Sequence, residues 1–291
     1  MTGAFPDVWP APAKINLFLH VVGRREDGYH NLQTVFQFID WQDDLRFTVT
    51  DDGRIARAKP IPGVEEERDL TVRAARLLKE AAGSRHGVRI ALTKRLPIGG
   101  GLGGGSSNAA TTLLALNALW GIQWPLERLA TLGLSLGADV PVFVQGTSAW
   151  AEGVGERLAP IALPEPWYVV VVPDATVLTG PVFAALDLTR FRPPITIRDF
   201  HAGAGGNDLA PVVRQSHRAV DEAWNWLERY GQVRMSGSGA SLFIEAPDPR
   251  YGQEVVAACP PHWRARLARG RNSHPVHARL GQFTHWGVAK R

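Results

Sequence analysis

The sequence predicts a mixed α/β (α+β) protein on the basis of three observations. Alternating polar and apolar residues over 13–22 indicate a strand, and apolar residues at helical spacing over 69–82 indicate a helix. A strand over 88–92 then leads through a glycine-rich segment directly into a further helix. With 291 residues, of which 45% are hydrophobic, the chain can bury the core of one large domain or of two ordinary ones.

Strands are expected to open the chain, and the first helix follows them. A hairpin turn at Asp27-Gly28 separates the first strand from a returning one. Residues 51–68 hold turn formers and charges and are expected to form a variable loop, and Gly83 is expected to stop the helix over 69–82. We expect strands over residues 13–22, 31–39, 44–50, 88–92, 140–144 and 147–151.

Further helices and strands are expected after the glycine-rich segment. Ser106 or Ser107 can cap a helix that runs to about Trp120, and Pro125 can open another that runs to about Leu136. In the second half we expect strands over 167–173, 233–235 and 242–245, and helices within 182–188 and 208–230. The proline-rich stretch 160–166 is the best candidate for a seam, which predicts domains 1–160 and 161–291.

Composition narrows the function classes. The single cysteine, Cys259, excludes an intramolecular disulfide and fits a reducing compartment. Residues 1–12 have neither the basic nor the apolar region of a signal peptide, and no apolar run approaches the ~20 residues that span a bilayer. We therefore expect a cytoplasmic protein without a membrane partner.

The net charge of +4 is unevenly distributed along the chain. Residues 81–126 contain no Asp or Glu but several basic side chains, so the local field favours an anion such as phosphate. The chain after Glu254 is also free of acids, and we interpret it as a solvated basic surface. No aromatic-plus-basic motif for reading RNA accompanies it, so no nucleic-acid partner is expected.

The residues with the clearest chemistry lie between Pro97 and Ser107. Six of the seven residues from Gly99 to Gly105 are glycine. Without side chains, these residues can bring several backbone N–H groups against an anion, and the following helix directs its positive end to the same point. A flexible linker is the alternative, but the strand directly before the glycines and the helix directly after them favour a phosphate-binding loop.

Three common phosphate-binding loops do not fit this segment. Gly99 to Gly104 matches G-x-G-x-x-G, but the nearest acidic residue, Glu127, opens a helix and does not end a strand as a dinucleotide site requires. A Walker A loop needs Lys after its glycines, whereas Ser106 follows Gly105 here. The H-R-D and D-F-G strings of protein kinases are absent.

The loop resembles that of the GHMP kinases, which has the form Pro-x-x-x-Gly-Leu-Gly-Ser-Ser-Ala. Here it is the longer Pro97-Ile-Gly-Gly-Gly-Leu-Gly-Gly-Gly-Ser-Ser-Asn-Ala-Ala110. Other segments resemble the family in the right order, over roughly residues 10 to 280: 12–17, 25–32, 136–143, 151–156, 206–209 and 236–241. The resemblance implies the GHMP kinase fold, with a ferredoxin-like C-terminal domain and an active site in the cleft between two domains. It also implies transfer of the γ-phosphoryl group of ATP to a hydroxyl.

The resemblance further implies a catalytic role for Lys14 and Asp139. Asp139 would accept the proton of the substrate hydroxyl, and Lys14 would pair with Asp139 and that hydroxyl. From the residues alone, Asp139 fits a turn or cap aspartate equally well, and Lys14 could lie in water on an edge strand. Asn16 shares the strand face of Lys14 and could hydrogen-bond the substrate.

The ATP phosphates would be bound by the loop, with Ser107 assisting the β- and γ-phosphates or Mg²⁺. The expected phosphate-binding residues are Pro97, Gly99, Gly100, Gly101, Leu102, Gly103, Gly104, Gly105, Ser106 and Ser107. Mg²⁺ keeps several waters and relies on substrate phosphates, so no protein metal cage is expected, and the nine histidines show no zinc spacing.

The extended loop and the hairpin containing Tyr29 and His30 resemble the branch of the family that acts on a cytidine diphospho-sugar alcohol. His30 would recognise cytosine and Tyr29 would stack on it, with Thr179 and Phe183 as a second wall. On its own, a Tyr-His pair beside a turn is more often a packing feature. Asp69 stands where the family often has Asn, which puts contacts on the adenine side in doubt.

Other functions remain open at this point. A GHMP kinase for homoserine or mevalonate is one alternative, although the hairpin argues against it. A nucleotide-responsive binding protein without chemistry is another, although the presence of both Lys14 and Asp139 argues against that. The protein is expected to be a monomer or a weak homodimer, and residues 281–291 have no match in the family.

Overall fold

Strands and helices alternate along the chain, and the strands form one ten-stranded sheet. The computed structural model describes residues 8–186 and 191–281. The strands are β1 (Trp9–Arg24), β2 (His30–Thr50), β3 (Ile55–Arg57), β4 (Gly87–Thr93), β5 (Ala149–Gly153), β6 (Arg157–Pro160), β7 (Trp167–Val172), β8 (Arg234–Met235), β9 (Leu242–Ala246) and β10 (Arg264–Arg271). The predicted mixture of helices and strands is confirmed.

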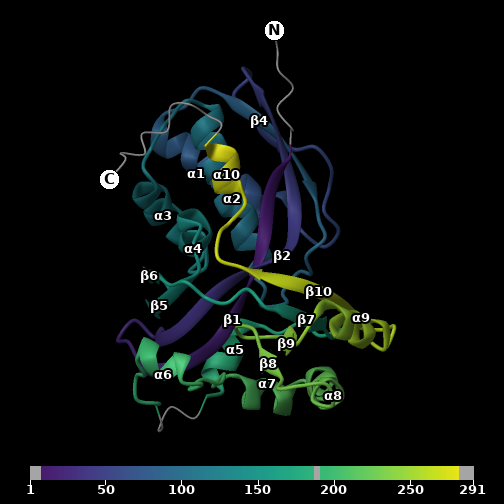
Figure 1. Ribbon diagram of the computed structural model, residues 1–291. Helices are drawn as coiled ribbons and strands as arrows, with labels where there is room; N and C mark the ends of the chain where they lie inside the picture. The colour runs from purple at the N-terminus through teal and green to yellow at the C-terminus, as the bar shows by residue number, and fades with distance from the viewer. Residues whose placement is uncertain (1–7, 187–190, 282–291) are drawn as a thin grey trace.

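Helices cover the sheet at both ends of the molecule (Figure 1). They are α1 (Leu70–Ala82), α2 (Gly104–Leu119), α3 (Leu126–Leu134), α4 (Val140–Gln145), α5 (Thr179–Ala184), α6 (Ile197–His201), α7 (Ala210–Ser216), α8 (Arg218–Leu227), α9 (Pro249–Ala257) and α10 (Val276–Leu280). A short 3₁₀ helix, η1 (Glu66–Arg68), precedes α1. Within the described ranges, no helix is both long and apolar enough to cross a membrane.

Strand β2 lies at the centre of the sheet. The main strand order is β3-β4-β2-β10-β7-β9-β8, and β2 also pairs with β1 and β5. The β1–β2 pair is antiparallel and shifts register at three places, one of them between Asn16 and Leu19. In Figure 1 these two strands extend from the α1–α4 end of the molecule to the α5–α8 end.

Three hydrophobic clusters form the core. One packs α1 to α4 against β1, β2 and β4, and a second packs α7, α8 and α9 against β7 and β9. The third lies between them and draws residues from β1, β2, β7 and β10. Leu19 and Val21 of β1 belong to the second cluster, so the first hairpin contributes to the core of the C-terminal half. The domain boundary at residue 160 stays a prediction.

The segment 140–144, expected as a strand, is helix α4, so that prediction is wrong. A short apolar run has the same composition in a buried strand and a buried helix. Pro141 lies in the first turn, where its missing N–H costs nothing, and Gly146 ends the helix with a φ of 75°. All residues from Val140 to Val144 are buried, against α2 and α3.

Other boundaries also differ from expectation. The two strands expected over 31–39 and 44–50 are one continuous strand, β2, and the loop over 51–68 contains β3 and η1. Neither Ser106 nor Ser107 caps α2, because the helix begins at Gly104 and its N-cap is Gly103. The helix expected over 182–188 is α5, and part of that range lies outside the described residues.

Helix α1 follows the prediction closely. Asp69 caps its N-terminus by accepting a hydrogen bond from the Thr71 N–H, and Gly83 ends it in the left-handed conformation with a φ of 63°. Helix α3 likewise begins directly after Pro125. The start of α1, at Asp69 and Leu70, borders the region described next.

Candidate active site

The glycine-rich loop joins β4 to α2 and needs glycine for steric reasons as well as conformational ones. Gly101 and Gly103 have φ values of 73° and 70°. A Cβ on Gly101 would lie 2.3 Å from the Ser236 carbonyl oxygen, and one on Gly103 would lie 2.9 Å from the Phe143 ring. The loop therefore packs against protein on one side and leaves its other side open.

The open side of the loop borders a cavity of about 310 Å³, which we call the loop cavity. Its lining includes Pro97, every residue from Gly99 to Ser106, Lys94 and Asp69. The N-terminus of α2 opens here, and its first turn contains no acidic residue. Backbone N–H groups and a positive helix end on an open surface fit the phosphates of a nucleotide.

A second turn, residues 236–241, holds the loop from the opposite side. The Ser236 hydroxyl donates to the Gly101 carbonyl at 2.9 Å, and the Ser241 N–H donates to the Gly100 carbonyl at 3.1 Å. On the strand side, the Lys14 N–H donates to the Leu102 carbonyl at 3.0 Å. Two segments that are distant in the sequence therefore hold the loop in place. In the sequence, residues 236–241 stood out only as a segment that resembles the family, and this contact was not predicted.

Lys14 and Asp139 form an ion pair beside the loop, as the resemblance implied. The Lys14 ammonium lies 3.2 Å from Asp139 Oδ2 and also donates to Asn16 Oδ1 at 2.6 Å and to the Gly101 carbonyl at 3.2 Å. Lys14 is only 2% exposed, so it does not lie in water on an edge strand. Such a buried ammonium needs these acceptors, because its charge is costly to bury alone.

Asp139 has the more open position of the two. Its side chain is 33% exposed and lines a larger cavity, although it directly precedes α4. Asp139 lies in a turn at the N-cap position of α4, but its carboxylate accepts no capping hydrogen bond from that helix. One carboxylate oxygen pairs with lysine while the group remains accessible, which suits a proton acceptor.

Asn16 is held rigidly in the same network. Its Oδ1 accepts from Lys14, and its Nδ2 donates to the Thr34 hydroxyl at 2.9 Å. Its backbone N–H donates to the Ser236 hydroxyl at 3.2 Å. These contacts use the amide to position the lysine, and Asn16 also lines the larger cavity, as predicted for a substrate-contacting residue.

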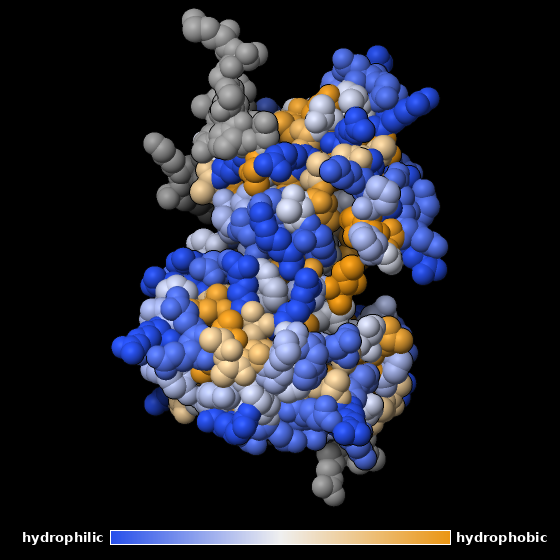
Figure 2. Space-filling view, turned by 90° about the vertical axis from the view of Figure 1, so that its right-hand side faces the viewer, coloured by the Kyte–Doolittle hydropathy of each residue, from blue (hydrophilic) through white to orange (hydrophobic). Residues whose placement is uncertain are grey.

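The larger cavity, about 860 Å³ and called here the acceptor cavity, brings together the remaining predicted site residues. Its lining includes Lys14, Asn16, Tyr29, His30, Asp139, Thr179 and Phe183. It shares Gly99, Gly101 and Ser106 with the loop cavity, so the two cavities meet at the glycine loop. Figure 2 shows a hollow between the upper and lower parts of the molecule, with hydrophobic residues beside it.

The far end of the acceptor cavity carries aromatic rings. The His30 and Phe183 rings are stacked with centroids 5.1 Å apart and an interplanar angle of 22°. Tyr29 is 65% exposed at the rim, and the Thr179 and Ser238 hydroxyls are 2.9 Å apart. His30 Nε2 is buried and has no hydrogen-bond partner in the part of the chain described. A ligand that entered here would meet an unsatisfied, directional polar atom.

The protonation state of His30 follows from its surroundings. Burial lowers the pKa of the imidazole below its ordinary value of 6.5, and the charge of Arg24 lowers this pKa further. The ring is therefore neutral at pH 7 and offers one donor and one acceptor nitrogen.

The two loop serines differ in position. Ser106 lines both cavities. Ser107 is fully buried, lines neither, and its hydroxyl has no hydrogen-bond partner among the described residues. The predicted role of Ser107 at the phosphates therefore gains no support from its position, and Ser106 is the better situated hydroxyl.

A buried aspartate supports the entrance of the loop and was missed by sequence reasoning. Asp43 accepts hydrogen bonds from Lys94 Nζ at 2.5 Å, from the Arg95 and Leu96 N–H groups at 2.6 and 2.8 Å, and from Asn108 Nδ2 at 3.0 Å. It is completely buried in β2. In the sequence, Asp43 falls between the two strands expected over 31–39 and 44–50, so no signal marked it. Asp69, the residue that departs from the family, caps α1 and lies 3.4 Å from Arg57.

The described residues contain no group of three or more His, Cys, Asp or Glu side chains that could hold a metal ion. Ser106 lines both cavities and Asp139 lines the acceptor cavity, so their side-chain oxygens are available beside the loop. This donor set fits a Mg²⁺ that binds mainly through phosphates and water.

Comparison with known proteins agrees with this geometry. The family described as "GHMP kinases N terminal domain" matches residues 69–147, and "GHMP kinases C terminal" matches residues 184–265. A protein of Nitrosococcus oceani named 4-diphosphocytidyl-2-C-methyl-D-erythritol kinase is 52% identical over 265 residues, which cover 91% of this chain and 95% of the relative.

Solved structures give the same result. A crystal structure of 4-(cytidine 5'-diphospho)-2C-methyl-D-erythritol kinase superposes with a TM-score of 0.80 at 38% identity, covering 90% of this chain and 98% of the other. A mevalonate kinase superposes with a TM-score of 0.62 at 14% identity, covering 91% and 99%, which indicates a shared fold only. The chain therefore belongs to the GHMP kinase family and, within it, to the group whose members are named 4-diphosphocytidyl-2-C-methyl-D-erythritol kinase.

Proposed function

We propose that the protein transfers the γ-phosphoryl group of ATP to the 2-hydroxyl of 4-diphosphocytidyl-2-C-methyl-D-erythritol. The observation that carries this proposal is the position of the Lys14–Asp139 ion pair on the acceptor cavity, beside the glycine loop where the two cavities meet. A nucleotide on the loop and an acceptor alcohol in the larger cavity would have their reacting ends next to this pair. The names of the relatives agree with this substrate.

The loop and α2 bind the nucleotide. Backbone N–H groups from Gly99 to Gly105 and the positive end of α2 neutralise the phosphate charge, and Ser106 adds a hydroxyl. Mg²⁺, when bound, would supply further positive charge for the transferring oxygens, and Ser106 and Asp139 line the cavities where it would be held. Phosphoryl transfer depends mainly on this positioning and charge.

Asp139 and Lys14 act on the acceptor hydroxyl. The Asp139 carboxylate accepts the hydroxyl proton as the oxygen attacks phosphorus, and the bond from the γ-phosphorus to ADP breaks. The Lys14 ammonium, held by Asn16 and the Gly101 carbonyl, keeps the carboxylate oriented and stabilises negative charge on the attacking oxygen. The ion pair thus serves both proton acceptance and alignment.

The aromatic end of the acceptor cavity binds the cytidine. A cytosine base presents adjacent donors and acceptors, and neutral His30 offers the unpartnered Nε2. The Phe183 and Tyr29 rings provide apolar faces on which the base can stack, and Thr179 adds a hydroxyl.

The protein acts in this proposal as a cytoplasmic monomer or weak homodimer.

A substrate panel tests the proposal. ADP release is measured by a coupled assay with ATP, Mg²⁺ and either the cytidine diphospho-sugar alcohol, mevalonate or homoserine. ADP release with the cytidine compound alone supports the assignment. Faster turnover with mevalonate or homoserine would assign a different acceptor, and ATP binding without turnover on any of the three would favour a non-catalytic nucleotide-binding protein.

A further inference from the structure

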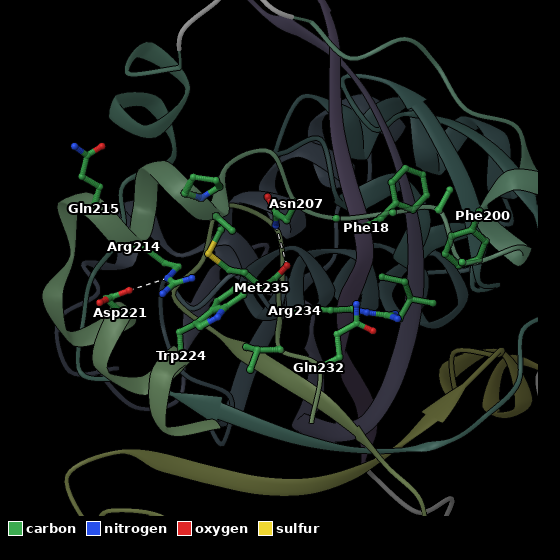
Figure 3. Close-up of a pocket in the computed structure, with 18 of the residues that line it drawn as sticks. Phe18, Phe200, Asn207, Arg214, Gln215, Asp221, Trp224, Gln232, Arg234 and Met235 are labelled. Atoms are coloured by element: carbon green, nitrogen blue, oxygen red, sulfur yellow. Dashed lines mark hydrogen bonds and ion pairs between the residues drawn. The ribbon is translucent and has the colours of Figure 1, made fainter. Parts of the chain in front are cut away.

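A third cavity lies apart from the two that form the active site. It has a volume of about 840 Å³ and is enclosed by β1, the segment 200–207, helices α7 and α8, and residues 232–235 (Figure 3). None of its lining residues lines the acceptor cavity or the loop cavity. We call it the α7–α8 cavity.

The charged groups of the α7–α8 cavity are mostly arginines. Two of these arginines form ion pairs with acidic side chains, and one does not. Arg214 is paired with Asp221 at 2.7 Å, and Arg218 with Glu222 at 2.7 Å. The Arg234 guanidinium lines the cavity and forms no ion pair or hydrogen bond with any residue that the structure describes. Asp221 is the only acid in the lining, so the cavity has one uncompensated positive charge close to apolar walls.

A second polar group is also unsatisfied. The indole N–H of Trp224 is buried and finds no hydrogen-bond acceptor within residues 8–186 and 191–281. The ring lies against Arg214, whose guanidinium carbon is 4.7 Å from the ring centroid. This N–H is closed off from the cavity, so the Trp224 ring offers an apolar face to the cavity and not a donor.

Apolar side chains form much of the remaining wall. Figure 3 shows Phe18 and Phe200 at one end of the cavity and Trp224 at the other, with Met235 between them. The Phe18 and Phe200 rings are 5.5 Å apart at an angle of 34°. Flat rings and a thioether favour an aromatic or otherwise apolar ligand body. The Arg234 guanidinium favours an anionic oxygen on that body.

The wall between this cavity and the active site is one residue thick. On β1, Leu17 and Phe18 line the α7–α8 cavity, whereas Asn16 and Leu19 line the acceptor cavity. Likewise Met235 faces the α7–α8 cavity, while Gly237 and Ser238 face the acceptor cavity.

Hydrogen bonds connect the two sides of this wall. Asn207, which lines the α7–α8 cavity, donates from Nδ2 to the Met235 and Gly237 carbonyls at 2.8 Å each. Ser236, between these two residues, donates to the glycine loop at Gly101. A ligand that moves Met235 or Asn207 would therefore shift the turn that holds the loop.

We propose that the α7–α8 cavity is a second binding site, for a small organic anion with an aromatic or other apolar body, and that its occupancy changes the affinity of the active site for the acceptor. The anionic oxygens are bound by Arg234, and the apolar body packs on Phe18, Phe200 and Met235. The binding part of the proposal does not depend on which acceptor the enzyme phosphorylates.

The experiment uses 8-anilinonaphthalene-1-sulfonate, an aromatic body with one anionic group, titrated into the full-length protein by fluorescence. Its neutral relative N-phenyl-1-naphthylamine serves as the matched probe. We expect one saturable sulfonate site that ATP does not displace. The cytidine diphospho-sugar alcohol should shift its Kd by the coupling factor without abolishing binding. Arg234→Gln should weaken sulfonate binding by about tenfold, since a hydrogen-bonded charge is lost, without affecting the neutral probe.

Two further variants separate this site from general effects. Arg198→Gln removes the same charge from an exposed position of α6 that does not line the cavity. This variant should change sulfonate binding less than twofold. Phe200→Leu removes the ring that lies against Phe18 and should weaken the binding of both probes several-fold. It also provides the test if Arg234→Gln does not fold. Equal binding by the Arg234 and Arg198 variants, or displacement of the sulfonate by ATP, would overturn the binding site.

Steady-state kinetics test the coupling. At a sulfonate concentration about ten times the wild-type Kd, the KM for the acceptor should change at least threefold in the wild type. Arg234→Gln is then only about half occupied and should show a clearly smaller change. An unchanged KM in the wild type at saturating sulfonate would overturn the coupling. Because the sulfonate titration needs no turnover, failure of this proposal is distinguishable from a wrong acceptor assignment.

Discussion

The two ends of the active site are built in different ways. The phosphate end is one continuous segment, residues 97–106, that presents backbone groups to the loop cavity. The base end is assembled from side chains on β2 and α5, where His30 and Phe183 stack although they are far apart in the sequence. A backbone site is specified locally by residues that lack side chains, whereas a side-chain site exists only after the fold has brought distant elements together.

The two ends also differ in what supports them. Gly101 is enclosed by the turn 236–241, so a side chain there would collide with main-chain atoms that cannot rotate away. His30 has an unsatisfied nitrogen and an exposed neighbour, Tyr29, which leaves this end adaptable. We therefore expect changes at the centre and at the phosphate end to be more harmful than changes at the base end.

Asp139→Asn should have the largest effect. Removing the proton acceptor between the two ends should lower kcat by about 10²–10⁴-fold, the usual contribution of a positioned base. ATP should still bind, because the loop is unchanged, and calorimetric titration can measure this. Asp174→Asn, an exposed position outside both cavities, is the matched control. Near wild-type turnover in Asp139→Asn would rule out the base assignment.

Gly101→Ala should come next. The new Cβ would lie 2.3 Å from the Ser236 carbonyl oxygen and 2.8 Å from that of Gly239, so the loop must move. We expect the KM for ATP to rise by about tenfold or more, with a lower melting temperature. Gly83→Ala has a similar positive φ but open space around it, and should cost only about 1 kcal/mol of stability with ATP binding intact. Identical behaviour of the two variants would show that strain alone, and not the contact with the second turn, matters at Gly101.

His30→Phe should have a smaller and more selective effect. The ring that packs on Phe183 is kept, but the donor and acceptor nitrogens are lost. We expect the KM for the cytidine substrate to rise by about 3–10-fold, which corresponds to one buried hydrogen bond, with little change in the KM for ATP. Equal effects on both KM values would argue against a base-binding role for this end.

The pH dependence should give the smallest effect. Because the pKa of His30 is lowered from 6.5, first by burial and then by Arg24, the imidazole stays neutral at pH 7 and gains a proton only below pH 6.5. The KM for the cytidine substrate should therefore be constant from pH 8 to about 6.5 and rise at lower pH, as the acceptor nitrogen is lost. His30→Phe should remove this acid rise, and a rise that persists in the variant would assign the titration to another group.

Features that depend on neighbouring residues were predictable from the sequence. The glycine loop after β4 and the start of α3 at Pro125 were expected and are present. Helix α1 also ends at Gly83 as expected, and it begins one residue after the start of the expected range 69–82. Each of these depends on backbone conformation or on hydrogen bonds within a few residues, so the order of amino acids contains the required information.

Features that depend on contacts between distant segments were decided by the tertiary structure. Residues 140–144 could have been strand or helix, and burial against α2 and α3 gave a helix. Only the fold buries Lys14 beside Asp139 and sets the turn 236–241 against the loop. The fold also places Ser106 in the lining of both cavities while it buries Ser107. The reason is physical: the sequence determines which local conformations cost little free energy, but the cost of burying a charge or a hydroxyl depends on partners that only the folded chain brings within reach.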